Sequence, residues 1–342
     1  MALRVWIQGL ALSLALGLPG AARALCDVTY KIQPGDTLFS VAEFHYGDRE
    51  KWTLIYYSNQ GVLSGVEQVS VGQDVYIPCP AQSIEPDATP LQQTVSAEMT
   101  LLTGSNYAPF ADKSWPGEGL ATELVNAALE MSPSPVPYAI AWEDDWGKHL
   151  FPLLDEKTYD MGFPWIRPDC DTDTGNQMCA SFHFSEPLMD LPMMLFKRQG
   201  GSFNYETDSD VLGKTLCRPA GYSTHDLDRA DRRWLTEGAI TLVQPDSPEA
   251  CFEALMAGDV DAVTVNVFLG ATKIVAMGLR GRAVPIDLPL SREKLHVIIS
   301  KTHWRGTTHL YRLNAGLAEL RDSGRYNEIV SRHLEIFWDQ LK

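Results

Sequence analysis

The sequence predicts an α/β protein built from two folded units, and three observations support this. Between Cys26 and Cys79, a short strand pattern is followed by two helical stretches and a second strand. Residues 80–98 then lack apolar periodicity and are rich in Ala, Gln, Ser, Pro, Thr and acids, which is typical of a linker. From Met99 to the C-terminus, strand and helix patterns alternate, and such alternation predicts a mostly parallel sheet covered by helices.

Composition and charge exclude several classes of function. The chain has 342 residues, 45% of them hydrophobic, which suits a globular protein with more than one core. Its formal net charge is −16, and no run of Lys or Arg offsets the acid locally. Such an excess of acid repels phosphate backbones and anionic lipid, so we expect neither nucleic-acid binding nor a role at a membrane surface.

Residues 1–24 have the parts of a secretory signal peptide. Arg4 precedes the apolar run Leu10–Leu18, and Ala22-Arg23-Ala24 is an A-x-A cleavage pattern. The apolar run is too short to span the hydrocarbon core of a bilayer comfortably. A lipid anchor on Cys26 is an alternative, but such cysteines usually follow a small residue, and Leu25 stands there. We therefore predict cleavage after Ala24 and an exported, soluble protein.

The cysteines favour disulfides rather than a metal site. Six of them remain in the exported chain, an even number. They include no C-x-x-C pair and no His/Cys cluster with the spacing of zinc ligands, so we predict neither metal nor cofactor. Six cysteines permit fifteen connectivities. Where the two units fall along the chain favours pairing in sequence order, Cys26–Cys79, Cys170–Cys179 and Cys217–Cys251.

The first unit is small and needs a covalent link. Strand patterns at Val28–Ile32 and Asp74–Ile77 flank its two helical stretches. Thr37 directly follows the turn Pro34-Gly35-Asp36 and is placed to cap the first helix, while Glu50–Ser58 forms the second. Because so small a unit has little core, a disulfide closing its ends would stabilise it by roughly 4 kcal/mol in the chain-entropy model.

Over its whole length, this unit closely resembles a LysM domain. The resemblance rests on Tyr30–Ala42, Tyr46-Gly47-Asp48, the Trp52/Ile55/Tyr56/Asn59 spacing and Val71–Pro78. LysM domains bind polymers that contain N-acetylglucosamine, in bacteria chiefly peptidoglycan, so the resemblance implies that residues 25–79 bind peptidoglycan. It places one wall of the sugar groove at Gly35, Asp36, Thr37 and Leu38, and the other at Val62–Val66. The residues of the first wall also suit purely structural roles, as a turn and a helix cap. The structural roles and glycan binding are compatible with each other.

Residues 99–342 resemble the extracellular solute-binding proteins that serve polar amino acids and similar small solutes. The similar segments follow the family's order: Leu101–Phe110, Gly119–Leu124, Tyr159–Gly162, Phe184–Pro187, Gly258–Ala262, Leu295–Lys301 and Asn314–Val330. The resemblance implies two α/β lobes that are joined by two crossing strands and close on a solute. Lobe one would be about 99–188 and 296–342, and lobe two about 189–295. It also implies a membrane transporter or a sensor as partner.

Two departures from the family pattern argue against a standard amino-acid ligand. Family members usually carry an arginine shortly before the F-S-x-P segment, which holds the ligand's α-carboxylate. Here no arginine stands at that distance from Phe184, and Arg167 is either a replacement or a surface residue. Asn266 stands where the family usually has an aspartate for the ligand's ammonium group, and its amide carries no charge. The resemblance therefore implies some other small polar or ring-containing solute.

Matched positions in both lobes supply further candidate ligand residues. Tyr107 and Phe110 on the first loop, together with Trp165, would stack on a ring or cover an apolar face, although Trp165 also suits a buried structural role. Gly221-Tyr222-Ser223-Thr224 resembles a family loop at a helix N-terminus, which offers backbone N–H groups to a polar or anionic ligand. An ordinary helix cap by Ser223 or Thr224 is the alternative. The predicted ligand residues are Tyr107, Phe110, Trp165, Arg167, Tyr222, Ser223, Thr224 and Asn266.

Catalytic motifs are weak in this sequence. Gly221–His225 differs from a nucleophile elbow at its last position, where His225 replaces glycine. Glu143-Asp144-Asp145 is more typical of a helix cap than of a glycosidase pair. We therefore predict no catalytic residues, and a periplasmic solute-binding protein held at the cell wall by its LysM module. A periplasmic enzyme that uses the same cleft, dehydratase-like or cell-wall-directed, is the alternative.

Overall fold

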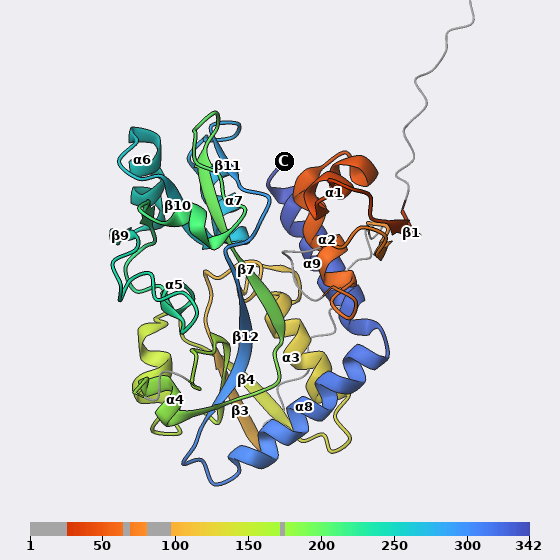
Figure 1. Cartoon of the computed structure of the whole chain (residues 1–342). Coiled ribbons are helices and arrows are strands. Elements are labelled where there is room, and N and C mark those ends of the chain that lie inside the picture. The colour runs from red at the N-terminus through yellow and green to blue at the C-terminus, as the bar shows by residue number, and fades with distance from the viewer. Residues whose placement is uncertain (1–25, 64–68, 81–96, 172–174) are drawn as a thin grey trace, which may run out of the picture.

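The computed structural model describes residues 26–63, 69–80, 97–171 and 175–342 (Figure 1). The predicted signal peptide, most of the predicted linker and residues 64–66 of the predicted groove wall lie outside the described residues. Within the described ranges, no helix is long and apolar enough to cross a bilayer.

The small N-terminal unit has the predicted order of strand, helix, helix and strand. Its elements are β1 (Val28–Lys31), α1 (Leu38–Tyr46), the short helix η1 (Arg49–Lys51), α2 (Trp52–Ser58) and β2 (Asp74–Ile77). The two strands pair antiparallel. Thr37 caps α1 as predicted, because its side chain accepts a hydrogen bond from the backbone N–H of Ser40. Phe39 and Trp52 stack at the centre of the unit, with 4.8 Å between their ring centroids.

In the described part of the chain from residue 97 onward, ten strands form one sheet. Its main path runs β4-β3-β5-β12-β7-β10-β8-β9, while β11 pairs with β7 and β6 with β12. The strands are β3 (Met99–Thr103), β4 (Tyr138–Trp142), β5 (Met161–Ile166), β6 (Phe182–Phe184), β7 (Met189–Arg198), β8 (Thr215–Cys217), β9 (Thr241–Val243), β10 (Ala262–Asn266), β11 (Ala283–Pro285) and β12 (Ser291–Ser300).

Two long strands, β7 and β12, connect two groups of shorter ones (Figure 1). We call the part around β3–β6 lobe one and the part around β8–β11 lobe two. Pairing is parallel within β4-β3-β5 and within β10-β8-β9, but β7 and β12 run antiparallel to each other and to their neighbours. The prediction of a mostly parallel sheet is therefore wrong. The sheet is mixed because the chain crosses between the lobes twice, in opposite directions.

Helices cover both lobes. Lobe one carries η2 (Pro116–Glu118), α3 (Leu120–Glu130), η3 (His149–Leu154), α4 (Gln177–Ser181), α8 (Gly306–Asp322) and α9 (Arg325–Gln340), and lobe two carries η4 (Asp208–Val211), α5 (His225–Asp228), α6 (Pro248–Ala257) and α7 (Val267–Ala276). The stripes predicted to face the core are buried: Leu120, Leu124, Val125 and Ala128 in α3, and Leu310, Leu313, Leu317 and Leu320 in α8. Gly324 separates α8 from α9 with a left-handed φ of 80°, as expected of a helix stop.

The packing of α8 on α3 depends on a glycine. A Cβ atom at Gly316 would lie 1.7 Å from the backbone oxygen of Ala128, which cannot move aside as a side-chain tip can. Only glycine therefore permits this approach of the two helices.

All three predicted disulfides are present. Cys26–Cys79 closes the N-terminal unit, Cys170–Cys179 closes the insert between β5 and β6, and Cys217–Cys251 joins β8 to α6. Such bonds are typical of exported proteins.

The N-terminal unit packs directly on the larger domain. Helix α2 lies against α9 (Figure 1). The indole N–H of Trp338 in α9 donates a buried hydrogen bond of 2.8 Å to Thr53 Oγ1. The N-terminal unit and the larger domain therefore share an interface in the described part of the chain.

Candidate ligand-binding site

A cavity of about 440 Å³ lies between the two lobes. Lobe one lines it with Arg167–Asp169, which follow β5, and Ser185–Pro187, which follow β6. Lobe two contributes His225 and Arg229, and β12 contributes Arg292–Lys294 and His296. Because both lobes and a connecting strand form its walls, any change in the angle between the lobes changes the shape of this cavity.

A buried ion pair positions the lobe-two wall. The Arg218 guanidinium is fully buried and donates two hydrogen bonds, of 2.5 and 3.0 Å, to the two carboxylate oxygens of Asp226. It also donates to the backbone oxygen of Ser223 at 2.6 Å. Burial alone raises the pKa of Asp226, but the charge and hydrogen bonds of Arg218 outweigh it and bring the pKa below its ordinary value. The pair therefore stays ionised and fixes the start of α5.

Glu293 of β12 lines the cavity and is only 7% exposed. Burial, and next the charge of Asp226, raise its pKa to about 8. Its Oε2 lies 3.4 Å from Nε2 of His225, whose pKa burial lowers below the ordinary value. Near pH 7, a protonated carboxyl and a neutral imidazole therefore face each other, and both remain able to hydrogen-bond a ligand.

Each lobe contributes a positively charged arginine to the cavity wall. Arg167 of lobe one lies over the ring of Phe184 and forms a 3.6 Å ion pair with Asp171, whose side chain is 84% exposed. Arg229 of lobe two forms a 2.8 Å pair with Asp231, also largely exposed. Exposed pairs contribute little, so both guanidinium groups can exchange their partners for a ligand at small cost.

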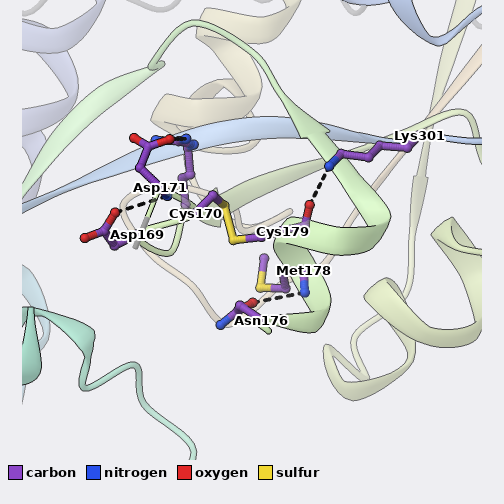
Figure 2. Close-up of a disulfide and its surroundings, with 8 residues drawn as sticks. Asp169, Cys170, Asp171, Asn176, Met178, Cys179 and Lys301 are labelled. Atoms are coloured by element: carbon purple, nitrogen blue, oxygen red, sulfur yellow. Dashed lines mark hydrogen bonds and ion pairs between the residues drawn. A yellow bond between two sulfur atoms is a disulfide. The ribbon is translucent and has the colours of Figure 1, made fainter. Parts of the chain in front are cut away.

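The described parts of the insert between β5 and β6 are linked to each other beside Arg167. Figure 2 shows the Cys170–Cys179 disulfide with Asp169 and Asp171 on one side and α4 on the other. Asn176 caps α4, and Lys301 from the end of β12 donates a 2.6 Å hydrogen bond to the backbone oxygen of Cys179 (Figure 2). The disulfide and this hydrogen bond limit the movement of the lobe-one wall.

A group of aromatic side chains lies at the ends of β3 and β5. Tyr107 packs edge-on against Trp146, and Trp146 packs edge-on against Trp165 and stacks on His149. Among the described residues, Trp165 Nε1 and His149 Nδ1 are buried without a hydrogen-bond partner. Burial, and next the charge of Tyr222 in lobe two, raise the pKa of Tyr107. The sequence-based list contains Tyr107, Trp165 and Tyr222 but lacks Trp146 and His149.

The predicted ligand residues are spread over several environments. All of them are described, and only Arg167 lines the cavity. Phe110 is fully buried and packs edge-on against Phe268 of α7, so it joins the lobes rather than facing a void. The Asn266 side chain caps α7 by accepting a 2.9 Å hydrogen bond from Leu269 N. Ser223 and Thr224 directly precede α5, with Ser223 Oγ 3.2 Å from His225 Nδ1. Their role in binding stays a prediction.

Sequence reasoning missed Glu293, His225 and Arg229 as cavity residues. Glu293 had one usable signal, because it is an acid inside the strand-like run that begins at Ser291. A buried position for such an acid requires a partner or a raised pKa. His225 and Arg229 had no comparable signal, since only the fold brings α5 to β12.

The predicted glycan loop is well ordered by its own hydrogen bonds. Gly35 has a φ of +90°, which favours glycine, and Asp36 Oδ2 accepts hydrogen bonds from Tyr30 OH at 2.8 Å and Gln33 N at 2.7 Å. Thr37 caps α1 and Leu38 is buried. The turn and cap roles are thus present, and the glycan role stays a prediction.

Comparison with known proteins supports the fold of the larger domain. The chain matches no protein-family model and no curated protein. It is similar to a histidine kinase sensor domain that itself resembles periplasmic binding proteins, at 18% identity and a TM-score of 0.51, over 69% of this chain and 96% of that chain. It is also similar to an ancestral amino-acid-binding protein, a precursor of cyclohexadienyl dehydratase, at 14% identity and a TM-score of 0.50, over 69% and 95%. The chain therefore contains a mixed α/β domain with a periplasmic-binding-protein-like fold.

Proposed function

We propose that this protein is a periplasmic solute-binding protein that captures a small polar solute between its lobes, for a membrane transporter or a sensor. The interlobe cavity carries the proposal, because both lobes and β12 contribute polar side chains to its walls. Closure of such a cavity removes water and strengthens each polar contact with the solute. The fold supports this interpretation but does not identify the solute.

The charges in the cavity favour a solute that carries a carboxylate. Arg167 and Arg229 approach from opposite lobes, and Lys294 of β12 also lines the cavity. The acids Asp169 and Glu186 also line the cavity, whereas Glu293 is protonated near neutral pH. Closure brings the arginines of the two lobes toward each other, so an anion between them would offset their repulsion. Two measurements test whether the solute carries a carboxylate. They are native mass spectrometry of the purified full chain and then calorimetry with succinate, glutamate and putrescine. Binding of the cation putrescine alone would contradict a carboxylate solute.

Arg229→Ala is expected to weaken carboxylate binding at least about tenfold, because a charge-assisted hydrogen bond contributes roughly 1.5–3 kcal/mol. Arg233→Ala is the matched control. Arg233 lies four residues further along, forms an exposed pair with Glu237 and does not line the cavity. Calorimetry with the carboxylate that binds the wild type measures the effect. Equal affinities of the two variants would remove Arg229 from the site.

One observation favours a second candidate function, a periplasmic enzyme that acts in the same cavity. Glu293, with a pKa of about 8, and a neutral His225 form a pair suited to proton transfer. Mass spectrometry after incubation with periplasmic metabolites distinguishes the two functions. Turnover that Glu293→Gln abolishes supports an enzyme, and a raised melting temperature without product supports a binding protein.

We further propose that the N-terminal unit is a LysM-type module that binds peptidoglycan. Its support is the sequence resemblance and the observed order of elements. The full chain is expected to sediment with insoluble peptidoglycan, and soluble N-acetylglucosamine oligomers are expected to release it, because both occupy one groove. Sedimentation that the oligomers do not reduce would contradict a sugar-specific site.

A further inference from the structure

Helix α2 of the N-terminal unit contacts both strands that connect the lobes. The Tyr56 hydroxyl donates a 2.5 Å hydrogen bond to Asp190 Oδ2 on β7, and it accepts one of 3.2 Å from Arg292 on β12. Arg292 and Asp190 also form an ion pair of 3.5 Å across the two strands. The neighbouring Tyr57 donates to the backbone oxygen of Asp190 at 2.6 Å. One turn of α2 therefore binds the place where the chain crosses between the lobes.

These contacts lie inside the protein. Tyr56 is fully buried and Tyr57 is 2% exposed. Burial raises the pKa of both tyrosines, so both hydroxyls stay protonated and donate. A buried donor that loses its acceptor carries a desolvation penalty. The geometry of Asp190 and Arg292 is consequently tied to the position of α2.

The same unit also contacts elements on either side of the connecting strands. Arg49 pairs with Asp287, which lies between β11 and β12. On the other side, the unit contacts two residues of α9. Lys51 pairs with Asp339 at 3.8 Å, and Thr53 accepts the hydrogen bond from Trp338. A movement of one lobe relative to the other must therefore alter at least one of these contacts.

Three consecutive residues of β12 link this interface to the solute cavity. Side chains alternate between the two faces of a strand. Arg292 bonds Tyr56 of the N-terminal unit, whereas Ser291 donates to Asp226 at 2.8 Å and Glu293 lies beside His225. The interface and the lobe-two wall of the cavity are thus held by adjacent positions on one rigid strand.

We propose that the N-terminal unit is an effector module, so that binding of an N-acetylglucosamine polymer to it changes the equilibrium between open and closed lobes. This inference rests on the proposed function, because it takes the module to bind glycan and the lobes to close on a solute. Coupling between two sites is reciprocal, so the glycan changes solute affinity by the same factor as the solute changes glycan affinity. The factor expected for such coupling is roughly 5- to 150-fold.

Distances between the lobes test the proposal without knowledge of the solute. Spin labels on non-natural residues at positions 253 and 322, exposed in α6 and α8, report the lobe separation by pulsed electron paramagnetic resonance. Cysteine labelling is avoided because all six cysteines are paired. The probe is the pentamer of N-acetylglucosamine, whose binding to the same full-length sample is first measured by calorimetry. Binding is expected to shift the distance distribution.

Matched tyrosine variants separate coupling from simple loss of a hydroxyl. Tyr56→Phe/Tyr57→Phe removes the hydroxyls that hold Asp190 and should bind the pentamer without a shift in distance. Tyr46→Phe removes a hydroxyl that bonds Pro78 within the N-terminal unit, and it should retain the shift. Pentamer binding to the wild type without a shift overturns the coupling alone. A shift that persists in the double variant overturns the role of the Tyr56 and Tyr57 hydroxyls in transmitting it. If the pentamer does not bind at all, both the coupling and the proposed glycan role are overturned.

Discussion

Asp226→Ala is expected to destabilise the protein by about 3–5 kcal/mol, because it leaves the fully buried Arg218 guanidinium without its charge partner. The substitution also removes the acceptor of Ser291 and the carboxylate that holds Arg218, the donor to the backbone oxygen of Ser223, so solute binding should fall as well. Urea denaturation followed by circular dichroism measures the loss.

Two further variants identify the cause of this loss. Glu237→Ala breaks an exposed ion pair with Arg233 and should change stability by less than about 1 kcal/mol. Replacing both partners, as Arg218→Met/Asp226→Leu, should recover much of the loss, since an apolar pair leaves no buried charge uncompensated. If the double variant were no more stable than Asp226→Ala, the buried charge would not be the main cause.

Ionisation of Glu293 is expected to make the stability of the protein depend strongly on pH. Its pKa rises from an ordinary 4.5 to about 8 in the folded protein. At roughly 1.4 kcal/mol per pKa unit, this shift corresponds to about 4–5 kcal/mol. Because the folded pKa is the higher one, the stabilising contribution of the protonated carboxyl is complete below pH 4.5. It is then lost progressively as the pH rises to about 8.

The charged and titratable groups around Glu293 come from α5 and from the segments directly after β8 and α5. They are Arg218 after β8, His225 and Asp226 in α5, and Arg229 directly after α5. Glu293→Gln removes the titration but keeps a polar side chain of similar size. The difference in free energy of unfolding between wild type and variant should therefore decline between pH 4.5 and 8 and then level off.

Urea denaturation at pH 5, 7 and 9 measures this difference. Glu253→Gln, at an exposed position of α6, is the control and should show no such trend. A difference between wild type and Glu293→Gln that stays constant across these pH values would show that Glu293 titrates as an ordinary carboxyl. It would also remove the argument that the cavity holds a protonated acid.

Much of the fold could be predicted because its signals are local. Thr37 caps α1 through a hydrogen bond to a residue three positions away, and apolar spacing alone marks the buried faces of α3 and α8. The disulfides followed from an even cysteine count and from the positions of the two units. The mixed sheet was missed because strand direction at β7 and β12 depends on the path between lobes, which short-range patterns do not encode.

The candidate site was only partly predictable for the same reason. Arg167 was found because it lies near a segment with a recognisable pattern. Asn266 carries a recognisable pattern too, yet only the structure shows that its amide is used to cap α7. His225 and Arg229 lie more than sixty residues from Glu293 in the sequence, and no periodicity connects them. His225 and Arg229 lie near Glu293 because β12 pairs with β7 and because the buried Arg218–Asp226 pair holds α5 in place.

Local patterns were enough to predict two α/β units, their disulfides and the apolar faces of their main helices, because spacing and turn chemistry act between near neighbours. Those patterns did not predict the contact of α2 with the connecting strands or the burial and raised pKa of Glu293. Both depend on contacts between segments that are far apart in the chain. Desolvation and hydrogen-bond partners at such contacts arise from packing, which no local pattern specifies.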